Sequence, residues 1–592
     1  MLSKEISMKK LLLLFFTSFI LSPLSAQTLT KGMTEQEKLF LPQYRIPLHD
    51  FSERNYSPYF LPPVAPVRVA AEWEEAQGYL ITWTSYTGML REIVRYGKQE
   101  CRMYIITNNA ANVITDLQNN GVDTTNLTFL NAPYNSVWAR DYGQNSVYLN
   151  QVDSLALVDW IYNRPRPKDD TIPESLARNL QIPIYHTTQA PYDLVNTGGN
   201  WMSDGMGTAF ASKLILDDNK PSGGFGINHT EAEIDTIAKK FMGIERYIKM
   251  QTLPYDGIHH IDMHMKLLDE ETLLVGQYPA GTADGPQIEA NIQYILSNYK
   301  TAFGTDYRII RIPMPADNGQ YPNGSGDYLT YTNASFINKT IIVPTYNIST
   351  DATALQIWRE ACPGYKVIGI NSTSSISASG ALHCITHEVG VSDPLLINHQ
   401  RLTDTYNTTV PYAVTAKIQH RSGIQSATLY YTIDTLQPYQ SSTLASTDGI
   451  NWQGAIPAQP AGTEVFYYLS GTSVSGKQQV RPITAPAGFY SFRVLENTGI
   501  QDFSSSEFFL LEDIFPNPSK GITCIPLFTS ASEKTTIDCL NALGETVETV
   551  FGGFSKPGEN KYFVDTNSFS SGVYFIRCRM GGVFKIKRFV VR

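Results

Sequence analysis

A repeated order of predicted elements constrains the fold of this chain more than any other feature. In residues 263–312 the apolar pattern predicts two strands that form a hairpin, then a helix, then a third strand. Residues 334–370 repeat this order at a period of roughly 70 residues, and strands and helices also alternate over 79–130. Such repeats indicate a radial or stacked assembly of small α/β units. Polar side chains near the ends of these units can converge on a central cavity.

The start of the chain carries the features of an export signal. A basic start, Met8-Lys9-Lys10, precedes an apolar core and the small residues Leu24-Ser25-Ala26, so residues 1–26 are predicted to be a signal peptide. The apolar core is too short to cross a bilayer, and no later run approaches the ~20 apolar residues of a spanning helix. We therefore predict an exported protein without a transmembrane segment. The Pro-rich residues 27–65 are expected to form a pro-segment or an extended arm.

The sequence pattern changes near residue 395. Residues 66–395 are assigned to the α/β domain, whereas residues 396–496 contain short β runs with turn signals and no helical pattern. This spacing fits an immunoglobulin-like β-sandwich, although the Cys…Trp…Cys core of antibody domains is missing. A Ser/Glu-rich joint at 504–507 precedes a further β region over 508–592.

Charge and cysteine content restrict the classes of function. A net charge of −9 gives no support for nucleic-acid binding and suits a cationic substrate. Hydrophobic and charged contents of 42% and 17% fit a folded, soluble protein. The six cysteines do not have the density of a disulfide framework, so Cys384 can remain a free thiol.

The stretch around Cys384 is the strongest candidate for catalysis. His383 and His387 flank this cysteine, and nearby cationic groups lower the pKa of a thiol and favour the nucleophilic thiolate. A buried structural cysteine is the alternative interpretation. Attack on a guanidinium also needs a group that protonates the departing nitrogen and later takes a proton from water. His260 is the candidate for this role.

Acidic and aromatic residues far upstream supply partners for a guanidinium. This group is planar and cationic, with donors along its edges, so two carboxylates that each accept a pair of hydrogen bonds are its natural partners. Asp141 and Asp262 are the candidates, and Trp138 is placed to stack on the planar cation. The alternative for Asp141 is a local ion pair with Arg140.

The same residues also permit a metal site. If residues 260–264 form a strand, His260, Asp262 and His264 share one face, and these residue types are good ligands for first-row metals. His383 and His387 would add to such a site. No HExxH or CxxC motif supports this metallohydrolase alternative.

Five stretches of the α/β domain together resemble the Porphyromonas-type peptidylarginine deiminases, within the wider agmatine deiminase group of guanidino-group-modifying enzymes. The resemblance covers about residues 66–395, and the motifs are highly specific in combination. They are Trp138-Ala139-Arg140-Asp141-Tyr142, residues 159–167, Thr197-Gly198-Gly199-Asn200, His260-Ile261-Asp262 and residues 381–388.

The resemblance implies a fold and a set of site residues. The implied fold is a five-fold pseudo-symmetric α/β-propeller, called a pentein, which agrees with the repeated units. It implies Cys384 as nucleophile, His260 as general acid and base, and two guanidinium-binding carboxylates, Asp141 and Asp262. Asn333 matches the active-site Asn of the family. Neither a metal nor another cofactor is implied.

Two arginines bear on the choice of substrate. Arg164 and Arg166 resemble the pair that the peptidylarginine type uses near the carboxylate of a C-terminal arginine. With Pro165 between them, they point to the same side if the backbone is extended there. The alternative is that they form structural ion pairs with Asp169 or Asp170.

Four residues depart from the patterns of the related enzymes. Cytoplasmic agmatine deiminases usually carry Trp-x-Arg-Asp-x-Gly-Pro and Glu-Gly-Gly, whereas this chain has Gln144 and Thr197 at two of those positions. Gly257 stands where the Porphyromonas enzyme has an aromatic residue in its substrate loop, and His259 replaces an Asn. The implied peptide preference therefore rests on fewer residues than the implied reaction.

The C-terminal region resembles the type IX secretion sorting domain of Bacteroidetes. The similar features are Pro516-Asn517-Pro518, Gly544-Glu545, Gly572-Val573-Tyr574 and the basic strand at 584–592. This resemblance implies that the type IX machinery carries the protein across the outer membrane. Release into the medium or anchoring at the cell surface would follow.

These observations predict a secreted hydrolase of linear amidines. The expected reaction converts the guanidinium of arginine, preferably at the C-terminus of a peptide, to citrulline and ammonia through a covalent Cys384 thiouronium intermediate. The expected partners are arginine-containing peptides or small guanidino compounds and the secretion machinery. The alternatives are a secreted agmatine deiminase that produces N-carbamoylputrescine, a metallohydrolase, and a surface binding protein with an inactive deiminase core.

Overall fold

The computed structural model describes residues 29–44, 58–316 apart from 280 and 283, 328–496, and 509–592 apart from 530, 531 and 581. The predicted signal peptide and the joint at 504–507 lie outside the described residues. The chain divides into two units, Met1–Glu496 and Asn497–Arg592. In the described part, no helix is long and apolar enough to cross a membrane.

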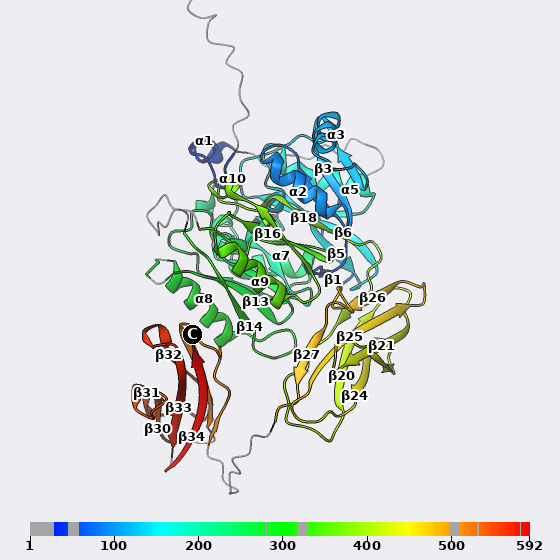
Figure 1. The fold of residues 1–592 in the computed structure, drawn as a ribbon. Coiled ribbons are helices and arrows are strands. Elements are labelled where there is room, and N and C mark those ends of the chain that lie inside the picture. Colours follow the sequence, from blue (N-terminus) through cyan, green and yellow to red (C-terminus); the bar gives the residue numbers. More distant parts are fainter. Residues whose placement is uncertain are drawn as a thin grey trace, which may run out of the picture. The chain divides into compact units, whose positions relative to one another are not determined.

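Five small sheets with a common connectivity make up the described part of residues 66–395 (Figure 1). In each sheet a central strand has one antiparallel neighbour and one parallel neighbour, and the parallel neighbour is reached through a helix. Two of the sheets are the ones that the sequence repeat predicts most clearly, and they are confirmed. They contain β12 (Met265–Asp269), β13 (Thr272–Gln277), α8 (Gly285–Asn298) and β14 (Arg308–Pro313), and β15 (Ser335–Ile337), β16 (Thr340–Thr345), α9 (Thr350–Ala361) and β17 (Lys366–Asn371).

Two further sheets follow the same order earlier in the chain. One contains β5 (Asn145–Leu149), β6 (Ser154–Tyr162), α5 (Ile172–Leu180) and β7 (Ile184–Thr187), with β1 (Val67–Val69) and β8 (Val195–Asn196) at its margins. The other contains β9 (Met202–Ser203), β10 (Thr208–Ser212), α6 (Leu214–Asp218), α7 (Glu231–Met242) and β11 (Arg246–Met250).

The fifth sheet joins the two ends of the α/β domain. Its elements are β2 (Ala76–Thr82), α2 (Thr87–Gly97), β3 (Arg102–Ile106), α3 (Ala110–Asn119), β4 (Leu127–Leu130) and β18 (His387–Gly390). Strand β18 pairs antiparallel with β2, with His387 opposite Leu80. The last strand of the domain therefore closes the sheet that the first part of the domain begins.

Local sequence explains why these helices form and where they lie. In α8, Ile288, Ile292 and Ile295 are spaced for one helix face and are buried, as the sequence predicts. Helix α7 begins with a Thr230–Glu233 capping box, in which each residue accepts a backbone N–H of the other. Apolar faces of this kind cover the small sheets, and polar residues at the sheet ends are left to form the site.

Residues 396–496 form two antiparallel sheets with one apolar core between them. Alternate residues of β25 are buried, which is the pattern of a strand with one face on a core. The predicted two-sheet β architecture is confirmed, and its immunoglobulin-like class stays a prediction. The strands are β19 (Leu396–Asn398), β20 (Tyr412–Gln419), β24 (Asn451–Ile456) and β23 (Ala445–Ser446), and β22 (Gln440–Thr443), β21 (Ile424–Thr432), β25 (Glu464–Ser473), β26 (Gln478–Arg481) and β27 (Tyr490–Arg493).

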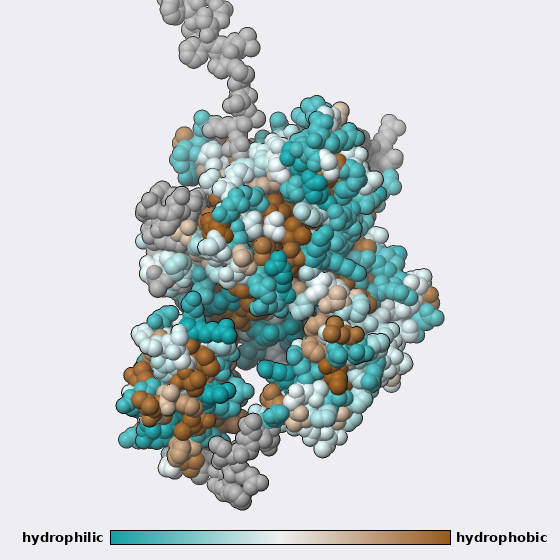
Figure 2. Space-filling view, in the orientation of Figure 1, coloured by the Kyte–Doolittle hydropathy of each residue, from teal (hydrophilic) through white to brown (hydrophobic). Residues whose placement is uncertain are grey.

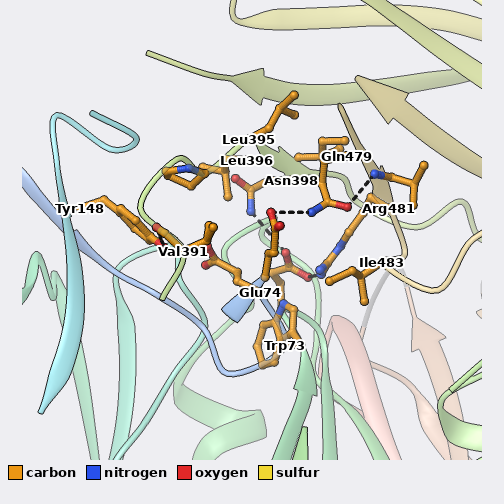
Figure 3. Close-up of a pocket in the computed structure, with 15 residues that line it drawn as sticks. Trp73, Glu74, Tyr148, Val391, Leu395, Leu396, Asn398, Gln479, Arg481 and Ile483 are labelled. Atoms are coloured by element: carbon orange, nitrogen blue, oxygen red, sulfur yellow. Dashed lines mark hydrogen bonds and ion pairs between the residues drawn. The ribbon is translucent and has the colours of Figure 1, made fainter. Parts of the chain in front are cut away.

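Charged pairs connect this β region to the α/β domain. Arg481 pairs with Glu270 at 2.6 Å, and Lys477 pairs with Glu75 at 2.7 Å. A small pocket at this junction is lined by Glu74 and Arg481 among others, and Gln479 crosses it to donate to Glu75 (Figure 3). Glu75 and Glu270 pair across the junction with Lys477 and Arg481, and Glu74 pairs with Arg68 within the α/β domain, so the charged groups that line the pocket already have partners.

The C-terminal unit consists of two antiparallel sheets around a separate apolar core. Large apolar side chains are also exposed on this unit, including Phe528, Phe554 and Phe584, and Figure 2 shows the resulting apolar patches. The strands are β28 (Phe509–Leu511), β29 (Ile522–Thr529) and β32 (Gly558–Asp565), and β30 (Lys534–Leu540), β31 (Thr546–Phe554), β33 (Gly572–Met580) and β34 (Val583–Val591).

Candidate active site

Cys384 lies in a short 3-10 helix, η7 (His383–Ile385), immediately before β18. The residue is fully buried, and its Sγ lies 3.3 Å from Asn333 Oδ1. The same Asn333 oxygen accepts the backbone N–H of His383 at 3.1 Å. Asn333 thus holds both the turn and the thiol, which gives the residue matched from the family a positioning role.

The prediction that residues 260–264 form a strand is wrong. His260 is extended, but Ile261–Met263 forms a 3-10 helix, η5, and β12 begins only at Met265. His259, before it, has a φ of 57°, so the chain turns sharply here instead of running straight into the strand. His260 and Asp262 nevertheless both reach the Cys384 region, because the turn directs them there.

Asp262 lies between the thiol and a histidine. Its Oδ2 accepts a hydrogen bond from His383 Nδ1 at 2.8 Å and lies 3.6 Å from Cys384 Sγ. His383 Nε2 lies 3.2 Å from Glu72 Oε2, so the imidazole bridges two carboxylates. His383 therefore orients the Asp262 carboxylate. The second oxygen of this carboxylate, Oδ1, is left to face another group.

In the described residues, the side chains are not arranged as the metallohydrolase alternative requires. Among the residues that the structure describes, no group of three or more His, Cys, Asp or Glu side chains is placed to hold a metal ion. His264 does not share a strand face with His260 and Asp262, because the intervening backbone is a turn. Burial lowers the pKa of His264 to about 4. His387 lies beside the backbone oxygen of Glu388 at 3.2 Å.

Asp141 is free of the local ion pair considered as its alternative. In α4 (Ala139–Tyr142), the neighbouring Arg140 pairs with Glu388 at 2.7 Å. Asp141 Oδ1 instead lies 3.5 Å from His260 Nδ1. Within the described residues, both Asp141 oxygens and both His260 ring nitrogens are buried without a hydrogen-bond partner. Buried polar atoms of this kind are ready to accept a ligand.

A lysine from the N-terminal region occupies the space between these groups. Lys31 is fully buried, and its Nζ lies 2.7 Å from Cys384 Sγ. The same Nζ lies 3.5 Å from Asp262 Oδ1 and 3.8 Å from Asp141 Oδ1. The site therefore surrounds the cationic end of a long side chain with one thiol and two carboxylates.

The three predicted substrate-binding residues all contact the chain around Lys31. Arg164 Nε donates to the carbonyl oxygen of Lys31 at 3.0 Å. Arg166 donates to the carbonyl oxygen of Thr30 at 2.7 Å and pairs with Glu37 at 2.7 Å. Trp138 is buried, and its indole N–H donates to the carbonyl oxygen of Leu29 at 2.9 Å. Stacking of Trp138 on a planar substrate stays a prediction.

The protonation states follow from burial and these neighbours. Burial and the nearby Asp262 raise the pKa of the Cys384 thiol to about 12, against the opposing effect of Lys31. Burial lowers the pKa of His260 well below its usual value, and Lys31 and Arg164 lower it further. Burial opposes ionisation of Asp262, but Lys31 and the His383 hydrogen bond outweigh it and lower its pKa. At neutral pH the site holds a thiol, a neutral imidazole and an ionised Asp262.

Lys31 and Glu72 belong to the site but were not predicted from the sequence. Lys31 lies in a Pro-rich stretch without a periodic pattern, and Glu72 precedes the first predicted strand. Glu72 also pairs with Lys266; burial raises the pKa of Glu72, but Lys266 and His383 outweigh burial and hold this pKa well below its usual value. Charge balance was the signal that could have pointed to Lys31, because two buried carboxylates require a nearby cation.

Gly199, in the motif that includes Thr197, is required by close approach. A Cβ at this position would lie inside van der Waals distance of His260 Nδ1 and 2.9 Å from Asp141 Oδ1. We expect Gly199→Ala to lower kcat/KM for deimination while the unfolding temperature changes little, because His260 must move away from Asp141. The matched control is Gly88→Ala, where nothing lies within 4 Å of an added Cβ. Unchanged kinetics in Gly199→Ala would contradict this account of the site.

Comparisons with known proteins place this chain among hydrolases that act on amidine C–N bonds. The profile of the Porphyromonas-type peptidyl-arginine deiminase family matches residues 68–389. The chain belongs to this family and is a guanidino-group deiminase. The profile of the secretion system C-terminal sorting domain matches residues 513–592, which confirms the predicted export to the cell surface or medium.

Individual relatives share the α/β domain. One protein of Legionella pneumophila (strain Paris) is 27% identical over 274 residues, which is 44% of this chain and 75% of the relative. Another from Vibrio parahaemolyticus is 24% identical, over 45% of this chain and 78% of the relative. Both bear the name "Putative agmatine deiminase".

One solved structure supports the pentein-like α/β fold of the catalytic domain, and a second shows a weaker similarity. A crystal structure of a protein given the same name has a TM-score of 0.50 at 18% identity and covers 57% of this chain and 99% of its own. The agmatine deiminase of Enterococcus faecalis has a TM-score of 0.47 at 18% identity, with coverage of 55% and 96%.

Proposed function

We propose that this protein hydrolyses the guanidinium of arginine to citrulline and ammonia, with a preference for arginine at the C-terminus of a peptide. The observation that carries the proposal is the convergence of Cys384, Asp141 and Asp262 on one buried cation, the Nζ of Lys31. A guanidinium carries the same charge on a side chain of similar length. It also adds the planar carbon that a thiol nucleophile can attack.

The unpaired atoms of the site match the donors of a guanidinium. The ammonium of Lys31 lies no closer than 3.5 Å to either carboxylate, so it leaves the Asp141 oxygens without a hydrogen bond within the described residues. A guanidinium has five N–H donors in a planar fork and can reach both carboxylates at once. Carboxylates on two sides would hold the central carbon over Cys384.

The proposed chemistry takes place in two steps on Cys384 and His260, while Asp141 and Asp262 hold the guanidinium. As the guanidinium enters, the Cys384 thiol passes its proton to His260, and Sγ forms a bond to the central carbon while the C=N electron pair moves onto a nitrogen. His260 delivers a proton to one terminal nitrogen, the C–N bond breaks, and ammonia leaves a thiouronium on Cys384. His260 then takes a proton from water, whose oxygen bonds to the same carbon. The C–S bond breaks, the proton held by His260 passes to Sγ, the remaining hydroxyl proton leaves with ammonia as ammonium, and citrulline and the Cys384 thiol are released.

These steps assign every proton and bond to protein side chains, water or the departing ammonia. Asp262 serves the substrate in this scheme and is not a metal ligand. We therefore expect citrulline formation to be unchanged after dialysis against EDTA. Complete loss in EDTA with recovery on addition of Zn²⁺ or Mn²⁺ would overturn this assignment and favour a metallohydrolase.

The peptide preference is supported by Arg164 and Arg166. The side chain of Lys31 fills the guanidinium position, and Arg164 contacts the carbonyl oxygen of this residue. In a bound C-terminal arginine, the equivalent oxygen is one of the two oxygens of the carboxylate. Arg166 already holds a carboxylate, that of Glu37. Agmatine has no carbonyl or carboxylate group at this place.

We expect Arg164→Ala to lower kcat/KM for a C-terminal arginine peptide roughly 10- to 150-fold more than for agmatine. This range corresponds to the ~1.5–3 kcal/mol of a hydrogen bond to a charged group, at ~1.4 kcal/mol per tenfold change. The ratio of the two kcat/KM values is the measurement to use, because a change in the amount of active enzyme affects both substrates equally.

Agmatine deimination to N-carbamoylputrescine is the second candidate. It is favoured by the names of the relatives from Legionella and Vibrio. Equal losses on both substrates in Arg164→Ala, or a clear preference of the unmodified enzyme for agmatine, would select this function. Citrulline formation from a panel of C-terminal arginine peptides, internal arginine peptides and free arginine, beside N-carbamoylputrescine formation from agmatine, tests both candidates.

A further inference from the structure

The N-terminal segment, residues 29–44, follows the path expected of a bound peptide. Its Lys31 side chain fills the guanidinium position, and chain continues on both sides of it. The backbone is held at successive points: the Lys31 N–H donates to the Ala378 carbonyl oxygen at 3.0 Å, and Arg164 contacts the Lys31 carbonyl oxygen. The segment is therefore bound through the groups that the proposed function assigns to substrate.

A second anchor holds the segment farther along. Glu37 forms a two-point contact with Arg166, through Nε at 2.7 Å and Nη2 at 3.2 Å. Glu37 is fixed for this contact, because it also forms a capping box with Thr34 at the start of α1 (Glu35–Phe40). Thus the segment presents a cation to the carboxylates of the site and a carboxylate to one of its arginines.

Charge explains why this arrangement is stable. Asp141 and Asp262 are fully buried, and buried carboxylates are costly unless a cation neutralises them. Lys31 supplies that cation with none of its side chain exposed. A substrate guanidinium needs the same volume and the same partners, so it cannot bind while Lys31 is in place.

The chemistry of lysine makes the bound segment inert. The ammonium of Lys31 touches Cys384 Sγ at 2.7 Å, but a lysine side chain has no amidine carbon for the thiol to attack. It also has no C–N bond that an addition step could weaken. The segment can therefore occupy the site indefinitely without being consumed.

We propose that residues 29–44 are an intramolecular pseudosubstrate, in which Lys31 imitates the guanidinium and Glu37 the carboxylate of an arginine substrate. The inference rests on the proposed deiminase function of the same site. The chain with this segment in place is a closed form of the enzyme, and displacement or removal of the segment opens the site. The N-terminal region thereby keeps the deiminase inactive until it is released.

The first test compares the unmodified full chain with Lys31→Ala, and uses Lys38→Ala as the matched control. Lys38 lies in the same segment, but it is exposed and pairs only with its neighbour Glu35 among the contacts of its side chain in the described residues. Two quantities are measured: citrulline formation from a C-terminal arginine peptide, and the rate at which iodoacetamide alkylates Cys384. Alkylation reports on access to the thiol and does not depend on deimination.

We expect Lys31→Ala to raise both rates roughly 10-fold or more, since at least one hydrogen bond to a charged group is lost, and Lys38→Ala to leave both unchanged. Glu37→Ala is expected to give a smaller increase through the loss of its contact with Arg166. Equal alkylation and equal citrulline formation in the unmodified chain and Lys31→Ala would overturn the inference. If Lys31→Ala is alkylated faster but forms no citrulline from any arginine compound, the deiminase function is refuted. The conclusion that Lys31 blocks access to Cys384 would still hold.

The second test converts the pseudosubstrate into a substrate. Lys31→Arg places a guanidinium on Cys384, so residue 31 itself should become citrulline, detected by mass spectrometry as replacement of an imino group by oxygen. The same chain with Cys384→Ser should keep arginine at position 31. If the Lys31→Arg chain deiminates added peptides but leaves the arginine at its own position 31 unmodified, the segment does not enter the site as a substrate does.

Discussion

Cys384→Ala is expected to reduce kcat for citrulline formation by more than ~10⁴-fold, because removal of a covalent nucleophile disables both chemical steps. The change is best made in the Lys31→Ala chain, where the site is open. The Cys384 side chain contacts Asn333 and Asp262 but supports no strand pairing, so the fold should remain intact. Cys101→Ala is the control, since that thiol lies outside the site.

An intermediate can be sought in the same experiments. Acid quenching of the Lys31→Ala chain during turnover should trap the thiouronium on Cys384, and intact-protein mass spectrometry would detect it. His260→Ala should slow both its formation and its hydrolysis, because the same imidazole serves both steps. Turnover of Cys384→Ala at the rate of its parent would rule out covalent catalysis by this residue.

Asp262→Asn is expected to lower kcat/KM by roughly 150- to 5000-fold, the equivalent of the ~3–5 kcal/mol lost when one partner of a buried ion pair is removed. The substitution keeps the size of the side chain and an oxygen for His383, but it removes the charge that faces the substrate cation. It should be measured in the Lys31→Ala chain, so that weaker binding of the segment does not offset weaker binding of substrate.

Asp116→Asn is the matched control for this change, because Asp116 pairs with Arg91 near the surface and away from the site. The unfolding temperature of both variants should stay close to that of the parent. An Asp262→Asn enzyme that keeps the kcat/KM of its parent would remove Asp262 from the guanidinium site.

The α/β units could be predicted from the sequence because their signal is local. The apolar spacing in α8 and the hairpin of β12 and β13 depend on neighbours a few residues away, and both are present as predicted. The two-sheet region after residue 395 could be recognised for the same reason. Its class could not be settled, since that depends on how distant strands connect.

The site was predicted in part. Cys384, Asp141 and Asp262 converge as expected, although Asp262 arrives on a turn and not on a strand. The strand was predicted because His260, Asp262 and His264 alternate along the sequence. The left-handed backbone at His259 changes the direction of the chain. The local propensity of histidine is too weak to predict this conformation. The role of Lys31 could not be predicted, because Lys31 and Cys384 are in contact but lie more than 300 residues apart in the sequence.

The pairing of β18 with β2 affects when a newly made molecule can become active. The reactive thiol sits in the turn before the strand that seals the domain, so it reaches its partners only when residues roughly 300 apart have met. A chain interrupted before Cys384 has the early carboxylate Asp141 but no assembled catalytic centre. Activity therefore depends on this long-range pairing, and a polypeptide that ends before Cys384 carries no deiminating activity.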